Sequence, residues 1–423
     1  MFDNNIILFP TTPKERTRFL AKSENPIYRN LTRLRHLTGW ALLIACVVFL
    51  ATNFTLLSPA SISQTISYIQ LTMAEPDSAL LGSIEYPTGS ISGAVQFGGG
   101  LALVDSDTLY VSQTGGLVQQ STQLSYTDPV IRSNGSRALT FDRGGKGVSL
   151  STAISTPVNM TLEDTILDAS LGQSNDFAVV TSATGYRAAV SVYTDGGEQR
   201  FRWSTPDYYV QSAALSPSGK RMCALAFYQE GIELRSKLLF FDLDQDAVQA
   251  EIELGSAVGV SLSYIDENTA FVVTDIGLLS ADLNAGTATT LASYTADELL
   301  GFALHDDRVL IATRAWSGGA RCALSLYDSN GLVGSATCAE EPVSLSLGSR
   351  EAVVLTASGL CVYDSDLTPQ WENPTIGGAS RVLLADNGSV WTLYSKYATL
   401  ISQSDADSAP VQEEAPDDTA DNA

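Results

Sequence analysis

The stretch AFVVTDIGLLSADLNAG, residues 270–286, decides the fold. One apolar run ends at Asp-Ile-Gly, a second follows, and Asn-Ala-Gly closes the unit. Short runs of β-branched, aliphatic and aromatic residues between Gly, Asn and Asp predict strands joined by tight turns. The same succession recurs at 177–197, 309–331 and 352–371. The chain is therefore expected to repeat one hairpin unit many times.

The spacing of these units predicts a β-propeller. The first strand of each unit is expected near residues 94, 130, 167, 212, 259, 301, 343 and 379. A period of about 40 residues with four short strands is typical of propeller blades, including WD40-like repeats, because one blade cannot bury both its faces alone. We predict an all-β propeller of eight blades over residues 81–401, with seven blades as the alternative count.

The last unit, residues 380–401, supplies three strands before the sequence changes character. In a closed ring the missing outer strand can come from the other end of the domain. Residues 83–86 precede the first unit and are suited to that role. Such closure would hide a sheet edge and hold the two ends of the propeller together.

The composition excludes several classes of function. The 423 residues carry 47 acidic and 24 basic side chains, a formal charge of −23. An acidic chain repels phosphate backbones, so no nucleic-acid partner is expected. Five Cys and two His leave little material for metal centres, and no nucleophile-elbow, Walker, H-E-x-x-H or C-x-x-C motif occurs. We predict no cofactor and no catalytic residue.

The N-terminal region predicts a membrane anchor. Residues 1–36 form a leader with seven basic and three acidic side chains, and residues 37–57 are 21 residues without a formal charge. An apolar run of about 20 residues is long enough to cross a bilayer as a helix. The positive-inside rule keeps the leader, which includes His36, in the cytoplasm and exports the remainder. The lipid bilayer is thus an expected partner of residues 37–57.

Three further features complete the predicted organisation. Ser58-Pro59-Ala60 allows the alternative of a cleaved signal peptide, although the long leader and the full-length apolar run favour an uncleaved signal-anchor. Residues 58–80 are interpreted as a juxtamembrane stalk. Residues 402–423 hold seven acids, no basic residue and no aromatic, which predicts a disordered acidic tail.

Several segments resemble a family of unknown function. They are Asp128-Pro129-Val130, residues 137–145 (RALTFDRGG), the run through Gly185-Tyr186 and Val192-Tyr193 to residues 201–204 (FRWS), and residues 214–220 (ALSPSGK). The family consists of single-pass, membrane-anchored propeller proteins of anaerobic Gram-positive bacteria, and the resemblance covers most of residues 35–401. Phe141 stands where that family more often has Tyr. The resemblance implies the fold and the topology. It supplies no established catalytic residues to carry over to this chain, so it leaves the activity open.

A looser similarity is to eight-bladed repeats of quinoprotein type. The hairpins that place Trp203 and Trp371 after an aromatic-acidic strand carry it. Because such repeats serve many non-enzymatic propellers, cofactor binding does not follow.

Two charged motifs are candidate sites. Asp142-Arg143 precedes Gly144-Gly145, so it can be a ligand contact on a propeller face or a structural ion pair that orders the turn; the structural pair is favoured. The four acids Asp242, Asp244, Asp246 and Glu253 have the spacing of a calcium loop. Ala247 stands where that loop needs Gly, so an ordinary hairpin turn is favoured.

Cysteine spacing allows one disulfide. Cys46 lies in the predicted span, and Cys223, Cys322, Cys338 and Cys361 lie outside it. A hairpin turning at residues 328–332 would place Cys322 opposite Cys338 in one register, where a cross-strand bond is geometrically allowed. The redox state of the host's surroundings decides between bond and thiols.

The remaining candidates also have ordinary structural interpretations. His305 lies in LHDDRV, where a solvated loop is favoured over a metal site. The aromatics Trp203, Tyr208, Tyr209, Trp316 and Trp371 suit either a binding surface or packing between blades, and packing is the commoner use.

The functional prediction is a non-catalytic binding or scaffold module at the cell surface, with a protein, peptide or glycan partner. The alternative is an exported hydrolase or lyase that acts on cell-wall polymers through carboxylates in the propeller channel. A sensor that signals to the short leader is a third possibility. Paired buried acids at a channel mouth would favour the enzyme, and an apolar-aromatic patch on a loop face would favour binding.

Overall fold

The computed structural model describes residues 37–41, 43, 82–86, 90–112, 118–245, 247–315, 321–374, 376–385 and 387–404. The chain divides into two units, Met1–Ser63 and Gln64–Ala423. In the first unit the described residues are helical, and the described part of the chain contains no helix with the length and apolarity needed to cross a membrane. This finding gives the predicted transmembrane helix no support. Most of that 37–57 segment, the leader, the stalk and residues 405–423 lie outside the described residues.

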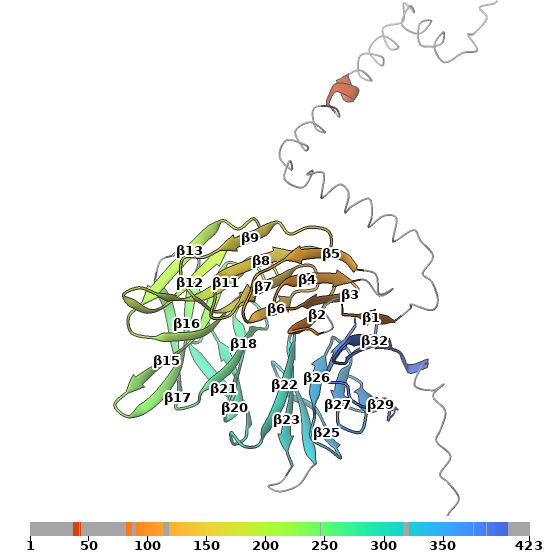
Figure 1. Ribbon diagram of the computed structural model, residues 1–423. Coiled ribbons are helices and arrows are strands. Elements are labelled where there is room, and N and C mark those ends of the chain that lie inside the picture. The colour runs from red at the N-terminus through yellow and green to blue at the C-terminus, as the bar shows by residue number, and fades with distance from the viewer. Residues whose placement is uncertain are drawn as a thin grey trace, which may run out of the picture. The chain divides into compact units, whose positions relative to one another are not determined.

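The second unit is a β-propeller. Its described strands form eight four-stranded antiparallel sheets, and these blades stand around a common centre (Figure 1). The predicted count of eight is confirmed, and the alternative of seven is wrong. The predicted first strands all fall within or next to the observed ones.

Each blade has four strands, a to d, from the centre outward. The a strands are β2 Gly93–Phe97, β6 Pro129–Ser133, β10 Ile166–Leu171, β14 Tyr209–Leu215, β18 Gly259–Tyr264, β22 Leu299–His305, β26 Ser344–Leu347 and β30 Arg381–Leu384. The b strands are β3 Gly100–Val104, β7 Ala138–Asp142, β11 Phe177–Ala183, β15 Arg221–Glu230, β19 Thr269–Thr274, β23 Arg308–Arg314, β27 Ala352–Leu355 and β31 Val390–Leu393.

The c strands are β4 Thr108–Ser112, β8 Gly147–Ser151, β12 Tyr186–Tyr193, β16 Glu233–Asp242, β20 Gly277–Asp282, β24 Cys322–Asp328, β28 Leu360–Tyr363 and β32 Tyr397–Ile401. The d strands are β5 Val118–Gln123, β9 Val158–Thr161, β13 Gln199–Thr205, β17 Val248–Gly255, β21 Thr287–Ser293, β25 Gly331–Cys338, β29 Pro369–Asn373 and β1 Ser83–Glu85.

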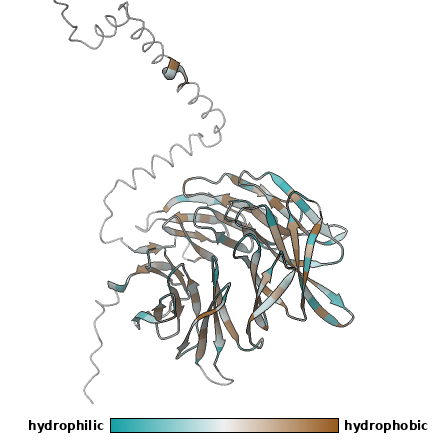
Figure 2. Cartoon of the chain, turned by 180° about the vertical axis from the view of Figure 1, so that it is seen from behind, coloured by the Kyte–Doolittle hydropathy of each residue, from teal (hydrophilic) through white to brown (hydrophobic). Residues whose placement is uncertain are grey.

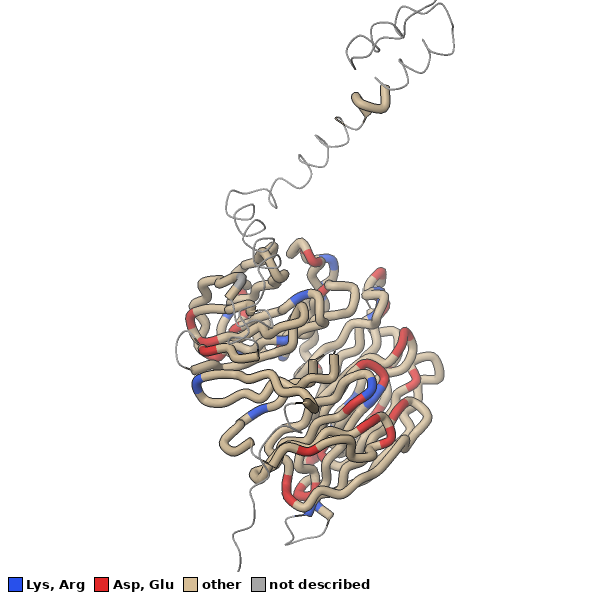
Figure 3. The backbone as a smooth tube through the Cα atoms, turned by 90° about the vertical axis from the view of Figure 1, so that its right-hand side faces the viewer, with Lys and Arg blue, Asp and Glu red and all other residues tan. Residues whose placement is uncertain are grey.

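The antiparallel order gives the propeller two unlike faces. The a–b and c–d turns lie on one, which we call the a–b face. The b–c turns and the connections from each d strand to the next a strand lie on the other, the b–c face. Acidic residues are spread over turns and strand ends around the ring (Figure 3).

The b strands form the centre of each blade's core. Those of the first and second blades, β3 and β7, are buried at every position. Apolar runs of this kind are expected where a strand is covered on both faces, and Figure 2 shows hydrophobic stretches within the strands of the visible blades. The predicted stacking of neighbouring blades is confirmed, because a cluster of buried apolar side chains occupies each of the eight junctions.

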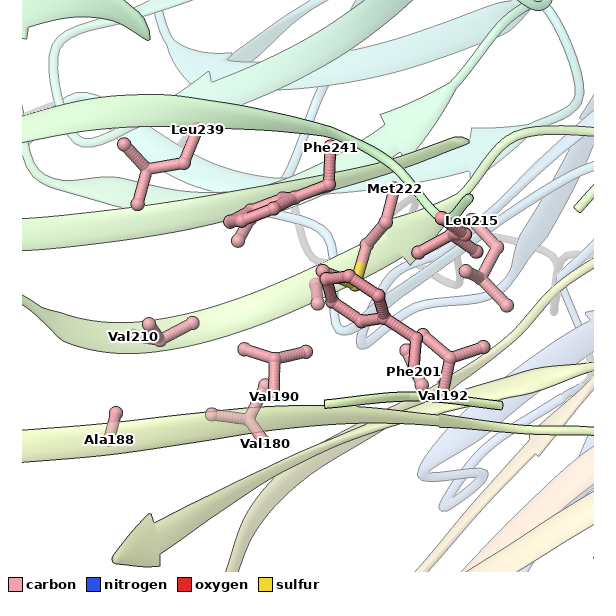
Figure 4. Close-up of a cluster of buried hydrophobic side chains, with 14 of the residues drawn as sticks. Val180, Ala188, Val190, Val192, Phe201, Val210, Leu215, Met222, Leu239 and Phe241 are labelled. Atoms are coloured by element: carbon pink, nitrogen blue, oxygen red, sulfur yellow. The ribbon is translucent and has the colours of Figure 1, made fainter. Parts of the chain in front are cut away.

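The junction between the third and fourth blades illustrates the packing (Figure 4). Val190 and Phe201 of the third blade lie against Met222 and Phe241 of the fourth. The rings of Phe201 and Phe241 meet edge to face with centroids 5.8 Å apart. Such contacts lock the angle between blades and so fix where the turns of each face lie.

The ring closes as predicted. β1, from the start of the propeller, pairs antiparallel with β32, from its end, and becomes strand d of the eighth blade. Ile84 and Tyr86 are buried in the cluster that joins the eighth blade to the first. Closure therefore depends on residues about 300 positions apart in the sequence.

Candidate binding surface

The central channel holds a cavity of about 640 Å³ near the a–b face. The ends of a strands from six blades line it, including Ile131, Ser170, Leu215 and Tyr264. The one acidic residue among its described lining residues is Asp306. The paired carboxylates that the hydrolase hypothesis requires are thus not assembled by the described residues of this wall.

A charge pair lies beside this cavity. Arg132 of β6 donates to Asp168 Oδ1 of β10 at 2.6 Å. Burial raises the pKa of Asp168, and the neighbouring Arg132 guanidinium opposes that rise. Because this carboxylate, which is 14% exposed, already has a cationic partner, it links the second and third blades and is not a free acid–base group.

A second cavity, of about 480 Å³, lies on the same face and is lined by residues of the first, sixth, seventh and eighth blades. Gln96, His305, Arg350, Glu351 and Asn387 line it. His305 Nε2 lies 3.4 Å from Asp306 Oδ2 at the end of β22. His305 is the last residue of β22 and is half-buried, so it lies beside the loop that was predicted and not within it. Among the described residues, no group of three His, Cys, Asp or Glu is placed to hold a metal ion.

The b–c face has a different character, because large exposed apolar side chains gather on three consecutive blades of it. Eight of the exposed large apolar residues described in the propeller lie on this face of the third, fourth and fifth blades. We call them the apolar rim: Leu167, Tyr186, Tyr209, Ile232, Leu234, Val258, Val260 and Ile276. Because exposed apolar patches commonly mark interaction sites, the apolar rim is the candidate binding surface.

Two members of the rim owe their exposure to β-bulges. The pairing of β10 with β11 shifts between Ile166 and Asp168, which leaves Leu167 unpaired. The pairing of β18 with β19 shifts between Gly259 and Ser261, which leaves Val260 unpaired. A bulge redirects a side chain and is a common device next to binding sites.

The most prominent part of the rim is the β15–β16 hairpin. Its two strands have ten residues each, against four to eight in the other c and b strands, so its tip extends beyond the neighbouring turns. At the tip, Gly231 adopts a positive φ of 63° and Ile232 is 99% exposed. A β-branched apolar residue at an exposed turn gains nothing from folding.

An aromatic stack supports the hairpin. The rings of Tyr209 and Phe227 lie parallel with centroids 5.2 Å apart. The guanidinium of Arg187, from the third blade, lies 4.8 Å from the centroid of Tyr209. The stack thus joins two blades and presents a half-exposed Tyr and a cation in fixed positions.

Lys237 ties the base of the same hairpin to its neighbours. Its side chain is 8% exposed, and Nζ donates to Glu251 at 2.9 Å and contacts Glu253 at 2.8 Å. It also lies 4.9 and 4.8 Å from the ring centroids of Tyr208 and Tyr228. Burial alone would lower the pKa of Lys237, but its hydrogen bonds to Glu253 and Glu251 outweigh burial and raise it. This cation therefore stays charged and holds β15, β16 and β17 together.

Asp142 and Arg143 both order a turn, but their partners are other residues and they do not form an ion pair with each other. Asp142 Oδ1 accepts hydrogen bonds from the backbone N–H groups of Thr127 and Asp128, at 2.8 and 2.9 Å. Arg143 pairs with Asp128, Nε to Oδ2 at 3.3 Å. Gly145 packs so close to Asp142 that a Cβ there would collide with the carboxylate. These contacts account for the FDRGG segment as local structure.

The calcium-loop acids do not converge. Asp242 Oδ1 accepts from the N–H of Asp244 at 3.1 Å, as in an ordinary turn after β16. Glu253 lies along β17 opposite Lys237 and away from that turn. Asp246 lies outside the described residues. The geometry is that of the hairpin turn, which was the favoured interpretation.

The predicted register of Cys322 and Cys338 is observed, because the two residues lie directly opposite each other in β24 and β25. Both are free thiols in the structure, as are Cys223 and Cys361. The disulfide itself stays a prediction.

The aromatic candidates separate into two groups. Trp203 packs on Phe241 at 4.9 Å and Trp371 is buried, so both serve blade packing. Tyr208 and Tyr209, at the start of β14, contact Tyr228 and Phe227 of the β15–β16 hairpin. Trp316 lies outside the described residues. Sequence reasoning missed the aliphatic members of the rim. The available signal was Gly231-Ile232 between Glu230 and Glu233, an apolar residue at a charged hairpin tip.

The fold and these sites define an eight-bladed β-propeller with an exposed apolar face. Residues 79–372 match the family of unknown function DUF5711, and the chain belongs to this family. A comparison with curated protein sequences finds no match.

Solved structures share the fold. Sqt1 of Saccharomyces cerevisiae is similar with a TM-score of 0.54 and 13% identity, over 75% of this chain and 97% of that one. The computationally designed Ika8 protein is similar with a TM-score of 0.54 and 11% identity, over 76% and 99%. The C-terminal WD40 domain of Sif2 is similar with a TM-score of 0.50 and 9% identity, over 76% and 97%. At these identities the likeness concerns the propeller fold alone.

Proposed function

We propose that this protein is a non-catalytic binding or scaffold module that holds a protein or peptide partner at the cell surface. The observation that carries the proposal is the apolar rim on the b–c face of three consecutive blades. In water each exposed aliphatic side chain forgoes the stabilisation of about 25 cal/mol per Å² that burial would give. A partner that covers the rim supplies that stabilisation.

The chemistry of the rim favours a polypeptide over a glycan. Six of its eight members are aliphatic, among them Ile232, Leu234 and Ile276. Sugars are bound chiefly by aromatic platforms with hydrogen-bonding side chains, whereas aliphatic side chains fit the apolar anchors of a protein or peptide. The stacked Tyr209 and the cation of Arg187 would then contribute orientation at one end of the rim.

The hairpin is also well ordered before any partner arrives. The Lys237 contacts and the Tyr209–Phe227 stack fix side chains on β14, β15, β16 and β17. A surface that is already ordered loses less conformational entropy on association and so binds more tightly.

The sequence supports a location outside the membrane. The leader of residues 1–36 carries a local charge of +4, and the uncharged residues 37–57 follow it. We therefore place residues 1–36 in the cytoplasm, the 37–57 signal-anchor in the bilayer and the propeller outside. Tethering would raise the effective concentration of the rim for neighbouring surface proteins.

Affinity capture with matched variants tests the proposal. The full-length tagged chain is recovered from solubilised membranes as wild type, as Ile232→Asp/Leu234→Asp, and as Leu332→Asp/Val333→Asp. Leu332→Asp/Val333→Asp is the control, since it places charges at an exposed aliphatic hairpin on the a–b face. We expect a specific protein with the wild type and the control and its loss with the rim variant. Equal recovery with the rim variant, or no specific protein with the wild type, would contradict the proposal.

A further inference from the structure

Three cysteines meet between the sixth and seventh blades. Cys322 and Cys338 lie opposite each other in the sixth, and Cys361 lies in β28 of the seventh. The Cys338 Sγ lies 3.4 Å from the hydroxyl of Tyr363, which also contacts Cys361. Cys322, Cys338 and Tyr363 are buried in the same core cluster.

A cavity of about 320 Å³ gives access to this cluster from the b–c face. Cys338 and Cys361 line it, and Cys322 does not. The cavity wall also carries two carboxylates, Glu340 and Glu372, and no basic side chain among its described residues. A small molecule that enters the cavity can therefore reach Cys338 and Cys361, whereas Cys322 lies behind Cys338 in the core.

We propose that Cys338 and Cys322 form a dithiol site that reacts with small cationic disulfides and is itself oxidised to a Cys322–Cys338 bond. Directly opposite residues of an antiparallel pair have Cα atoms about 4.5 to 5.5 Å apart, within the range that a disulfide spans. The bond can thus form without moving either strand by much.

The chemistry balances in two exchange steps. The Cys338 thiolate attacks one sulfur of the disulfide, which forms a mixed disulfide on Cys338 and expels one thiolate. Cys322 then gives its proton to that thiolate and attacks the Cys338 sulfur. This attack expels the second half of the molecule as a thiolate, which takes up the proton that Cys338 released when it formed its own thiolate. One external disulfide is reduced to two thiols, and two protein thiols are oxidised to one disulfide.

The surroundings suit these roles. A hydrogen bond from Cys322 lowers the pKa of Cys338, and the Tyr363 hydroxyl adds to this effect against the opposing influence of burial. The same hydrogen bond raises the pKa of Cys322, with burial adding to it. Burial also raises the pKa of Cys361 and of Cys223. Since the thiolate is the attacking species, Cys338 is the nucleophile of the group.

The acidic wall sets the preference for substrate charge. Glu340 accepts from the N–H of Ser358 at 3.1 Å, and Glu372 lies 3.7 Å from the sulfur of Cys361, so both carboxylates hold fixed positions at the cavity. A cationic disulfide is attracted there, and a dianionic one of similar size is repelled.

The test treats the reduced full-length chain with cystamine, quenches with iodoacetamide and identifies the modified cysteines by peptide mass spectrometry. The wild type should yield the Cys322–Cys338 disulfide, and Cys322→Ala should stop at cysteamine joined to Cys338. Cys338→Ser should give neither product, and Cys361→Ser should behave as the wild type. Cystamine should react several-fold faster than dithiodiacetate after each rate is divided by that with free cysteine.

Rapid quenching of the wild type provides a readout that does not depend on the folding of a buried-site variant. The Cys338 mixed disulfide should appear first and the Cys322–Cys338 bond second. A wild-type bond between Cys338 and Cys361 would overturn the assignment. So would modification of Cys223 or Cys361 as fast as Cys338, or the absence of any reaction at Cys338.

Discussion

Ile84 of β1 lies opposite Ala398 of β32, so the first strand of the propeller completes its last blade. Ile84 is buried against the eighth and first blades. Removal of β1 would expose both a sheet edge and a core junction. This strand is therefore the point at which the ring is held closed.

We expect Ile84→Asp to lower the free energy of unfolding by about 3 kcal/mol, because it removes apolar contacts and buries a carboxylate without a partner. Ser83→Ala, at an exposed position of the same strand, should change it by less than about 0.5 kcal/mol. Urea unfolding followed by the fluorescence of the fully buried Trp391 measures both. Equal stability of the two variants would show that β1 does not close the ring.

The second prediction concerns the Lys237 network. Glu251→Gln/Glu253→Gln leaves the Lys237 ammonium without its anions, and we expect a loss of about 1 to 2 kcal/mol, since both carboxylates are half exposed to solvent. Glu233→Gln, at an exposed position of the same hairpin outside the network, is the matched control and should change the free energy of unfolding by less than about 0.5 kcal/mol.

The pH dependence of that loss has a defined sign. Burial favours the neutral form of Glu253, but Lys237 and Tyr228 outweigh it and hold its pKa below the usual range. A carboxyl with a lowered folded pKa stabilises the fold above its unfolded pKa of about 4.3, and the stabilisation is lost as pH falls through the folded value. The difference between wild type and variant should therefore shrink below about pH 4. A difference that stays constant down to pH 2 would contradict the ion-pair account.

The third prediction concerns thiol reactivity. The hydrogen bond from Cys322 lowers the pKa of Cys338 to about 7, whereas burial raises that of Cys361 to about 11. The rate of Cys338 alkylation should rise with pH and reach half its plateau near pH 7, while Cys361 should still be slow at pH 9. Cys322→Ala should move the Cys338 midpoint upward. Coincident pH profiles for the two cysteines would contradict this assignment.

The fourth prediction concerns topology. Because a basic leader precedes an uncharged span, protease added to intact protoplasts should digest the propeller and spare a tag at residue 1. A tag that is digested while the propeller is protected would show the opposite orientation, and protection of both would place the whole chain inside.

The sequence was sufficient for most of the architecture. Gly and Asp-Gly punctuation between apolar runs predicted the blades, their number and the contribution of residues 83–86, because strand period and turn chemistry are local properties. The register of Cys322 and Cys338 followed from one hairpin turn in the same way.

The apolar rim and the thiol cavity could not be predicted in this way. Tyr209 and Arg187 belong to different blades, as do Cys338 and Tyr363. Contacts between blades depend on the angle at which the sheets stack, which no spacing in the sequence encodes. The exposure of Leu167 and Val260 depends on bulges that shift the register by one residue.

Site-specific photo-crosslinking in intact cells tests the central claim most directly. A photoreactive amino acid replaces Ile232 at the tip of the β15–β16 hairpin or, as the control, Leu332 on the a–b face; both side chains are exposed, at 99% and 60%. We expect irradiation to join the chain to one discrete protein from position 232 and to give no such product from position 332. Added purified propeller protein should reduce the yield of the product from position 232. Equal products from both positions, or none from position 232, would contradict a binding role for the apolar rim.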